Sequence, residues 1–415
     1  MKITLSVFLL IFFTISISAQ EATQKLTYKF YGFVRGDYYY DSRQSVASSE
    51  GLLFLYPKDK QYDAVGEDLN AVASTGLFAF NTRPGVEVSG LKVFDADVLA
   101  RAEADFAGFG GSVSNSTVLR IRLAYVKMQW KKAALTLGQD WHPFFGPVIP
   151  GQISLSTGAP FQPFNRSPQA RLDYKLGKVT LKGAAIYQFQ FTSPGPEGKS
   201  NSYQRKAIIP ELTAMIDYQY KSINAGAGIN LLTLKPRTSS VIDDKIYKVD
   251  ENLSSLSYTA YLKYKQDLFS AAIKTTYGQN TVNMTMLGGY GIKSIDQVTG
   301  KQKYTNFTHS SSWLNLSYGS KYLGNILLGY TKNLGTKDAL VENSTTYGEG
   351  LNIKDLYRLS GTFSYNIKHF SVGLEYEFST ANYGDTNSFD WEEGTYSSTH
   401  SISNHRIIGV ARYDF

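Results

Sequence analysis

The chain has 415 residues, no cysteine and a formal net charge of +7 at pH 7. The lack of cysteine excludes disulfides and a lipid-modified cysteine. Tyrosine, phenylalanine and glycine are abundant, with 30, 24 and 36 copies. Beyond residue 20, however, no run of about eighteen apolar residues remains, so the sequence offers no transmembrane helix there.

Residues 1–19 have the features of a secretory signal peptide. Lys2 supplies the positive start, residues 3–17 are apolar and uncharged, and Ser18 and Ala19 are small residues before Gln20. An N-terminal membrane helix is the alternative, which is disfavoured because no charge cluster follows at once. We therefore predict an exported protein whose mature domain is residues 20–415.

The first segment of the mature chain, residues 26–41, alternates between two kinds of side chain. One face carries apolar and aromatic residues, and the other is mostly polar or charged, with Phe33 as the exception. The same alternation recurs at residues 170–176, 211–220 and 370–378. In a soluble sandwich the apolar face would form the core, whereas in a membrane barrel it would face lipid and the polar face would line the lumen.

The connections between the candidate strands distinguish these two interpretations. Short and long links alternate along the chain, which is typical of a transmembrane barrel with short periplasmic turns and long outer loops. The short links are near residues 90–92, 131–132, 177–178, 221–222, 266–267, 319–323 and 367–369. The long links are residues 42–75, 107–116, 142–167, 193–207, 235–252, 280–304, 335–352 and 381–402. We predict an all-β, antiparallel transmembrane barrel of about sixteen strands, with fourteen or eighteen as alternatives.

The third long link has an unusual composition. Six of the twelve prolines fall between Pro143 and Pro168, together with several aromatic residues, and residues 141–172 contain no Asp or Glu. Because proline restricts the backbone and aromatic rings pack, we expect an ordered loop. In general porins the third loop folds into the lumen and narrows it, and this resemblance implies the same path here; a packed extracellular loop is the alternative.

Arginines are concentrated on the polar faces of the first strands. We predict that the following line the pore or contact solute: Arg35, Arg83, Arg101, Arg120, Arg122, Arg166 and Arg171. Guanidinium groups in a narrow channel attract carboxylates and phosphates. The same strands carry carboxylates such as Glu87 and Glu103, so pairing of the arginines with these groups is the alternative.

Three short motifs resemble the DcaP-like trimeric porins: residues 31–37 (YGFVRGD), 119–125 (LRIRLAY) and 137–141 (LGQDW). The resemblance covers the first third of the chain best. It implies a homotrimer that takes up small anionic solutes such as dicarboxylates, with Arg35, Arg120 and Arg122 facing the lumen. Some members have an N-terminal coiled coil, but only a few residues separate Gln20 from the first strand here, so a trimer would rest on contacts of the barrel wall.

The chain ends on an amphipathic segment and Phe415. A final strand with a terminal aromatic residue resembles the signal read by the barrel-assembly machinery, which we therefore expect as a partner. The predicted location is the outer membrane, among lipid and lipopolysaccharide. We predict a passive diffusion porin with no cofactor and no nucleic-acid partner.

Two alternatives remain open from the sequence. One is an adhesive or structural barrel that does not conduct, and the other is a barrel hydrolase. Among the five histidines, His309 precedes Ser310, Ser311 and Ser312, but no spacing identifies a third catalytic group. No metal-binding or phosphate-loop motif is present. We therefore predict neither catalytic nor metal-binding residues.

Overall fold

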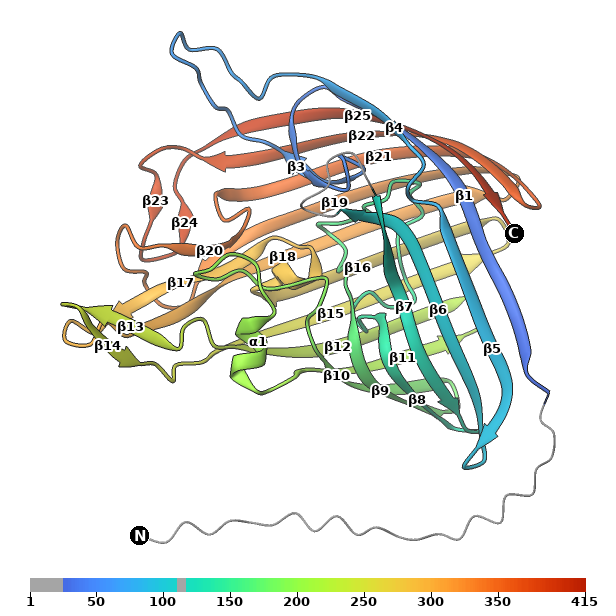
Figure 1. Cartoon of the computed structure of the whole chain (residues 1–415). Coiled ribbons are helices and arrows are strands. Elements are labelled where there is room, and N and C mark those ends of the chain that lie inside the picture. The colour runs from blue at the N-terminus through green and yellow to red at the C-terminus, as the bar shows by residue number, and fades with distance from the viewer. Residues whose placement is uncertain (1–24, 110–116) are drawn as a thin grey trace, which may run out of the picture.

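The computed structural model describes residues 25–109 and 117–415. The predicted signal, residues 1–19, and part of the second long link therefore lie outside the described residues. The chain forms a closed antiparallel barrel of sixteen strands, which confirms the predicted fold class (Figure 1). β1 and β25 close it, with Val34 opposite Tyr413 and Tyr40 opposite Ile407.

The wall strands follow one another in chain order around the barrel. They are β1 (Thr27–Asp41), β4 (Ser74–Phe78) continued by β5 (Arg83–Val93), β6 (Ala96–Phe109), β7 (Thr117–Gln129), β8 (Ala133–Trp141), β9 (Arg166–Leu176), β10 (Val179–Ile186), β11 (Glu211–Tyr220), β12 (Ile223–Leu234), β15 (Leu253–Gln266), β16 (Phe269–Gln279), β18 (Gln302–Gly319), β19 (Tyr322–Thr336), β21 (Ile353–Ile367), β22 (Phe370–Gly384) and β25 (Thr399–Asp414).

The remaining elements belong to the long connections. They are β2 (Ser45–Ser48), β3 (Leu53–Pro57), α1 (Ser202–Ala207), β13 (Ser239–Ile242), β14 (Lys245–Lys248), the short 3-10 helix η1 (Thr281–Met284), β17 (Gly288–Ile295), β20 (Thr346–Glu349), β23 (Phe389–Asp390) and β24 (Thr395–Tyr396).

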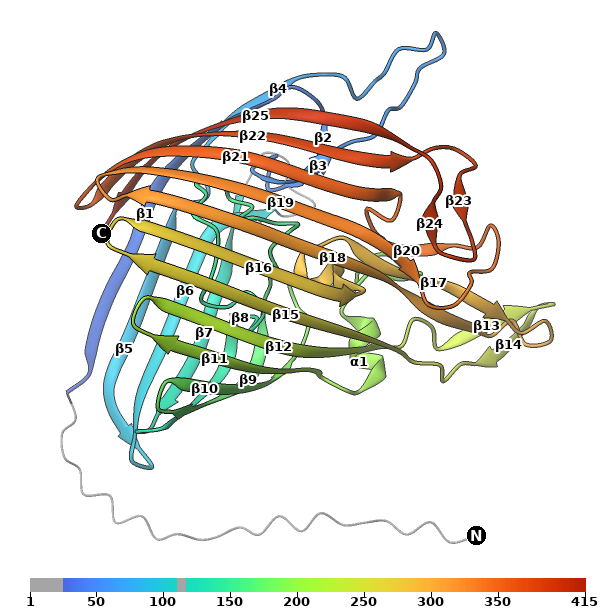
Figure 2. The same cartoon turned by 180° about the vertical axis from the view of Figure 1, so that it is seen from behind.

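The two ends of the barrel differ in their connections. The start of β1 and the C-terminus lie at one end, called here the turn end, and the long connections gather at the other, the loop end (Figures 1 and 2). Turns at the turn end are tight because residues such as Gly177 and Lys221 adopt positive φ, 63° and 49°. We number the long connections L1 (42–73), L2 (110–116), L3 (142–165), L4 (187–210), L5 (235–252), L6 (280–301), L7 (337–352) and L8 (385–398).

The alternation along the strands separates an apolar outer face from a polar inner face. In β1, Phe30 is 76% exposed on the outside, whereas Asp37 on the inside is 1% exposed. Phe33, the exception on the polar face, faces inward, where the guanidinium groups of Arg83 and Arg412 lie 4.8 and 4.0 Å from its ring centre. An apolar outer band of this kind is what a bilayer requires of a barrel. Among the described residues, no helix is both long and apolar enough to cross a membrane.

Candidate functional site

Six of the seven predicted arginines lie on the inner face of the wall from β1 to β9, and Arg166 is at the start of β9. The centre of this set is formed by β5, β6 and β7. Arg120 donates from Nε and Nη2 to both oxygens of Asp105, at 3.0 and 2.9 Å. Arg122 binds Glu103 and Asp105, each at 2.9 Å, and Arg83 lies 3.5 Å from Glu103. Three arginines therefore share two carboxylates.

The other wall arginines also have acidic neighbours. Arg101 lies 2.6 Å from Glu87, and Arg171 lies 3.0 Å from Asp140. Arg35 donates to Asp37 at 2.7 Å and to the carbonyl of Ile153 in L3 at 2.5 Å. The structure thus places these arginines on the inner wall and pairs them with carboxylates.

Arg166 differs from the rest of the set. Its guanidinium lies 4.8 Å from the ring centre of Trp141, 5.3 Å from that of Phe164 and 5.4 Å from that of Phe191. Arg122 faces the same Trp141 ring at 5.9 Å. Arg166 is 1% exposed, and within the described part of the chain its Nε and Nη1 have no hydrogen-bond partner and it forms no ion pair. Among the described residues, three aromatic rings therefore face this buried charge.

Counting these groups gives the central cluster an excess of positive charge. Arg83, Arg120, Arg122 and Arg166 oppose Glu103 and Asp105, which leaves a formal charge of +2 (four minus two). The side chains of Arg83 and Arg120 are 20% and 27% exposed. These two groups can meet a solute in the lumen, and the buried pair behind them adds to their field.

L3 folds into the barrel, as predicted, and binds the wall opposite the arginines. Lys274 of β16 donates to the carbonyls of Phe144 and Phe145 at 2.5 and 2.9 Å. Arg358 of β21 donates to the carbonyl of Ala159 at 3.0 Å. Lys274 and Arg358 are each 1% exposed, and both anchor the backbone of L3.

The middle of L3 is fixed through one peptide unit. The N–H of Ile153 donates to Glu375 of β22 at 2.7 Å, while its carbonyl accepts from Arg35 of β1 at 2.5 Å. The indole N–H of Trp313 donates to Gln162 at 2.8 Å further along the loop. L3 therefore contacts strands from β16 round to β1 and leaves the wall from β5 to β7 facing the lumen.

L1 also enters the barrel, which was not predicted. Its hairpin β2–β3 brings Phe54 beneath Arg358 and Arg406, whose guanidinium groups lie 4.8 and 5.3 Å from the ring centre. Arg358 also donates to the carbonyl of Leu55 at 2.8 Å, so one side chain binds both loops. The sequence contains an indication of this inward path, because residues 52–56 (LLFLY) form an apolar run inside an otherwise polar link.

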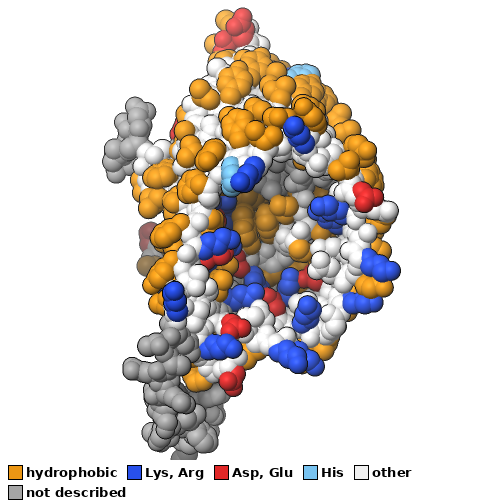
Figure 3. Space-filling view, turned by 90° about the vertical axis from the view of Figure 1, so that its right-hand side faces the viewer, with side chains coloured by type: hydrophobic (Ala, Val, Ile, Leu, Met, Phe, Trp, Pro, Cys, Tyr) orange, Lys and Arg blue, Asp and Glu red, His pale blue; other side chains and the backbone are white. Residues whose placement is uncertain are grey.

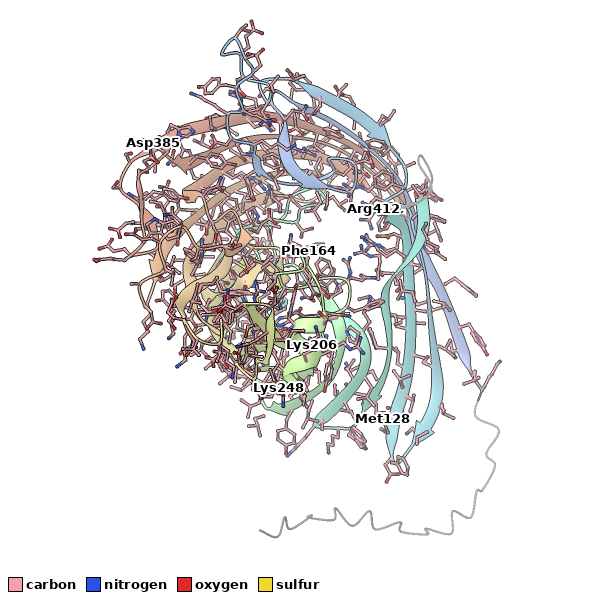
Figure 4. The ribbon with its side chains drawn as sticks, turned by 60° about the vertical axis from the view of Figure 1, so that its left-hand side comes forward. Met128, Phe164, Lys206, Lys248, Asp385 and Arg412 are labelled. Carbon is pink, nitrogen blue, oxygen red and sulfur yellow. The ribbon has the colours of Figure 1, made fainter. Side chains whose placement is uncertain are left out.

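The turn end of the barrel is hollowed, with charged side chains around the opening and apolar side chains deeper inside (Figure 3). Phe164 of L3 lies near the middle of the barrel, and Arg412 of β25 lies on the wall near it in this view (Figure 4). The site is therefore a passage bounded by a charged wall on one side and two inward loops on the other.

The structure does not assemble the hydrolytic site considered above. His309 is buried, and neither of its ring nitrogens has a hydrogen-bond partner among the described residues, while Ser311 bonds Thr331 instead. A base that contacts no hydroxyl cannot activate a nucleophile. Within the same residues, no cluster of three or more His, Asp or Glu side chains is arranged to hold a metal ion.

No protein-family model and no curated protein sequence matches the chain. Solved structures do. The outer membrane channel DcaP of Acinetobacter baumannii matches with a TM-score of 0.65 and 20% identity over 94% of this chain and 97% of that one. An anion-selective porin from Comamonas acidovorans matches with a TM-score of 0.54 and 10% identity over 94% and 100% of the two chains. The trimer form of OmpT of Vibrio cholerae matches with a TM-score of 0.53 and 11% identity over 94% and 99%.

The chain has the fold of an outer-membrane porin. The resemblance of its sequence to DcaP-like porins is confirmed as a resemblance of the whole barrel. At these identities the likeness concerns architecture, and the roles of individual side chains rest on the geometry described above.

Proposed function

We propose that the protein is a passive diffusion channel for small hydrophilic anions such as dicarboxylates. The observation that carries this proposal is the excess positive charge of the central cluster, where two partly exposed arginines face the lumen across from L3. Fixed charge in a narrow, partly desolvated passage favours solutes of opposite sign. L1 and L3 limit solute size, and no bond is made or broken. The description of one similar structure as an anion-selective porin supports the same preference.

We further propose that the channel works as a homotrimer in the outer membrane. One similar barrel is described as a trimer form. The contact between subunits would use part of the apolar outer wall, where many large hydrophobic side chains are exposed. The rest of this wall would face lipid and lipopolysaccharide. Phe415, which packs against Gly32 at the barrel seam, is the proposed contact for the barrel-assembly machinery.

The decisive experiment measures single-channel conductance and reversal potential of the refolded protein in a planar bilayer under a salt gradient. We expect stable conductance steps, which would occur in groups of three for a trimer. The sign of the reversal potential should be that of a channel that prefers anions. Replacing Arg120→Ser and Arg122→Ser together lowers the formal charge of the central cluster from +2 to 0, so the anion preference should disappear.

A control removes two cations outside the lumen. Lys131→Ser with Lys132→Ser changes the exposed periplasmic turn between β7 and β8 and should leave the reversal potential unchanged. A folded barrel without conductance would contradict the channel proposal and favour an adhesive or structural barrel. Unchanged anion preference in the double arginine variant would show that the central cluster is not its source.

A further inference from the structure

A pocket lies at the loop end, away from the passage. It has a volume of about 410 Å³ and is formed between L7 and the L8 hairpin β23–β24. Figures 1 and 2 show β20 of L7 beside this hairpin at the rim. The lining residues that matter for its chemistry are Thr346, Asn352, Phe389, Trp391 and Tyr396. None of its lining residues is charged.

Strand register places part of the pocket on the side of β17 and β20 away from the cluster that fills the loop end. Gly289 of β17 stands opposite both Phe307 and Gly348, so these three residues share one face. Neighbouring Tyr290 faces the other way, into the tyrosine and leucine cluster that fills the loop end. Phe307 and Gly348 line the pocket, which is therefore separated from this cluster by the strands between them.

The aromatic walls of the pocket are held in place. The ring of Phe389 lies 4.8 Å from that of Trp391 and 4.9 Å from that of Tyr396, both in edge-to-face contact. The carbonyl of Trp391 accepts the N–H of Leu340 at 2.7 Å, and the carbonyl of Glu393 accepts that of Thr336 at 2.9 Å. The hairpin is thus fixed to L7 and β19, and its rings need little reorganisation to bind a ligand.

Several polar side chains on the pocket wall have no hydrogen-bond partner among the described residues. Within the described residues, no side-chain hydrogen bond is made by the indole N–H of Trp391, the hydroxyl groups of Tyr396 and Thr346, or the amide of Asn352. These groups offer donors and acceptors beside aromatic faces. A ligand that matches them is neutral, has an apolar C–H face and carries several hydroxyl groups.

We propose that this pocket binds a hexose ring. A pyranose places its C–H face against an aromatic ring and its hydroxyl groups toward amide, indole and phenol groups, and about 410 Å³ is in the range of pockets for small ligands. The pocket lies beyond the apolar band, so two sources present such rings: the sugar chain of lipopolysaccharide and free saccharide outside the cell. This site is separate from the passage and does not depend on the proposed function.

The test is calorimetric titration of the refolded barrel with maltose, and in parallel with lipopolysaccharide that has or lacks its outer sugars. We expect saturable binding of at least one probe, weakened about tenfold by Trp391→Ala and by the milder Asn352→Ala. Trp130→Ala, which removes an exposed indole at the turn end, is the matched control and should bind as the original chain does. A heat-dependent shift on electrophoresis verifies that each variant is a folded barrel.

Binding of maltose identifies free saccharide as a ligand, and binding only of lipopolysaccharide with its outer sugars identifies the membrane as the source. If neither probe binds, or if both pocket variants bind as well as the control, the proposal is overturned. Conductance is expected to be unchanged in Asn352→Ala, so failure of this proposal is distinguishable from failure of the channel proposal.

Discussion

The two halves of the barrel use inner-face cations in opposite ways. On the wall from β5 to β9, Arg83, Arg101 and Arg120 pair with carboxylates of neighbouring strands and keep 20–30% of their side chains exposed. On the wall opposite, Lys274 and Arg358 donate to loop carbonyls and are 1% exposed. Position on the inner face therefore does not define a pore-lining cation. Lys274 and Arg358 are covered because the loops whose carbonyls they bind lie over them. A carboxylate partner does not by itself keep a cation exposed, since Arg122 and Arg406 bind carboxylates and are buried.

The largest expected effect separates two equally buried arginines. Arg166 and Arg406 are each 1% exposed, but Arg406 lies 2.6 Å from Asp41, whereas Arg166 forms no ion pair with any described residue and lies against aromatic rings. Removing one partner of a buried ion pair costs about 3–5 kcal/mol, whereas removing an unpaired buried charge relieves its desolvation. Arg406→Met should therefore lower the free energy of unfolding, and Arg166→Met should leave it unchanged or raise it.

Denaturant unfolding in detergent measures both variants. Bilayer recordings provide the second measurement, because Arg166→Met should also reduce anion preference by removing one charge from the central cluster. Equal destabilisation by both substitutions would mean that Arg166 has a charged partner in the folded protein.

The next effect concerns the anchors of L3. Lys274→Met removes the side-chain donor of the Phe144 carbonyl, while the Phe145 carbonyl keeps the amide of Gln162 at 2.9 Å. A buried carbonyl without a partner costs about 1–3 kcal/mol. The loop should leave the wall more often, which single-channel recordings would detect as greater current noise and higher mean conductance. Arg101→Met removes an inner-face cation that contacts no loop, so it should change selectivity without added noise. Quiet recordings from Lys274→Met would contradict the anchoring role.

The smallest effect concerns a contact between L1 and L8. His400 lies 2.7 Å from Asp59 of L1 and 2.8 Å from Asp385 of L8, and its hydrogen bond lowers the pKa of Asp385 below the ordinary value of 3.8. The charged carboxylate therefore contributes stability above about pH 4, and this contribution is lost as the pH falls through the lowered pKa. We expect L1 to become more accessible to protease only in that acid range.

Because the groups are largely solvent-accessible, the change in cleavage rate should be about twofold or less. In the Asp385→Asn variant, the protease should cleave L1 at the same rate at every pH in this range. If the cleavage rate of the original protein and that of the Asp385→Asn variant depend on pH in the same way, the contact between His400 and Asp385 is not the cause of the pH dependence.

Period-two alternation and the spacing of turns were enough to predict the barrel, because a two-faced strand and its connections are local properties of the sequence. The prolines and aromatic residues of L3 predicted an ordered loop, and its inward path was expected from the resemblance to general porins. The pairing of Arg120 with Asp105 could not be predicted, since it depends on the register between β6 and β7, which periodicity does not fix. The anchoring role of Lys274 was missed for a related reason: its partners are carbonyls 129 and 130 residues away.

The double contact of Arg358 with both loops has a consequence for biogenesis. Its partners Leu55 and Ala159 precede it by 303 and 199 residues, so L1 and L3 leave the ribosome long before the strand that holds them. Contacts between such distant segments form late, because closing the intervening chain costs entropy. The narrow part of the passage is therefore completed only after β21 joins the sheet, and the nascent barrel is wider inside than the finished one.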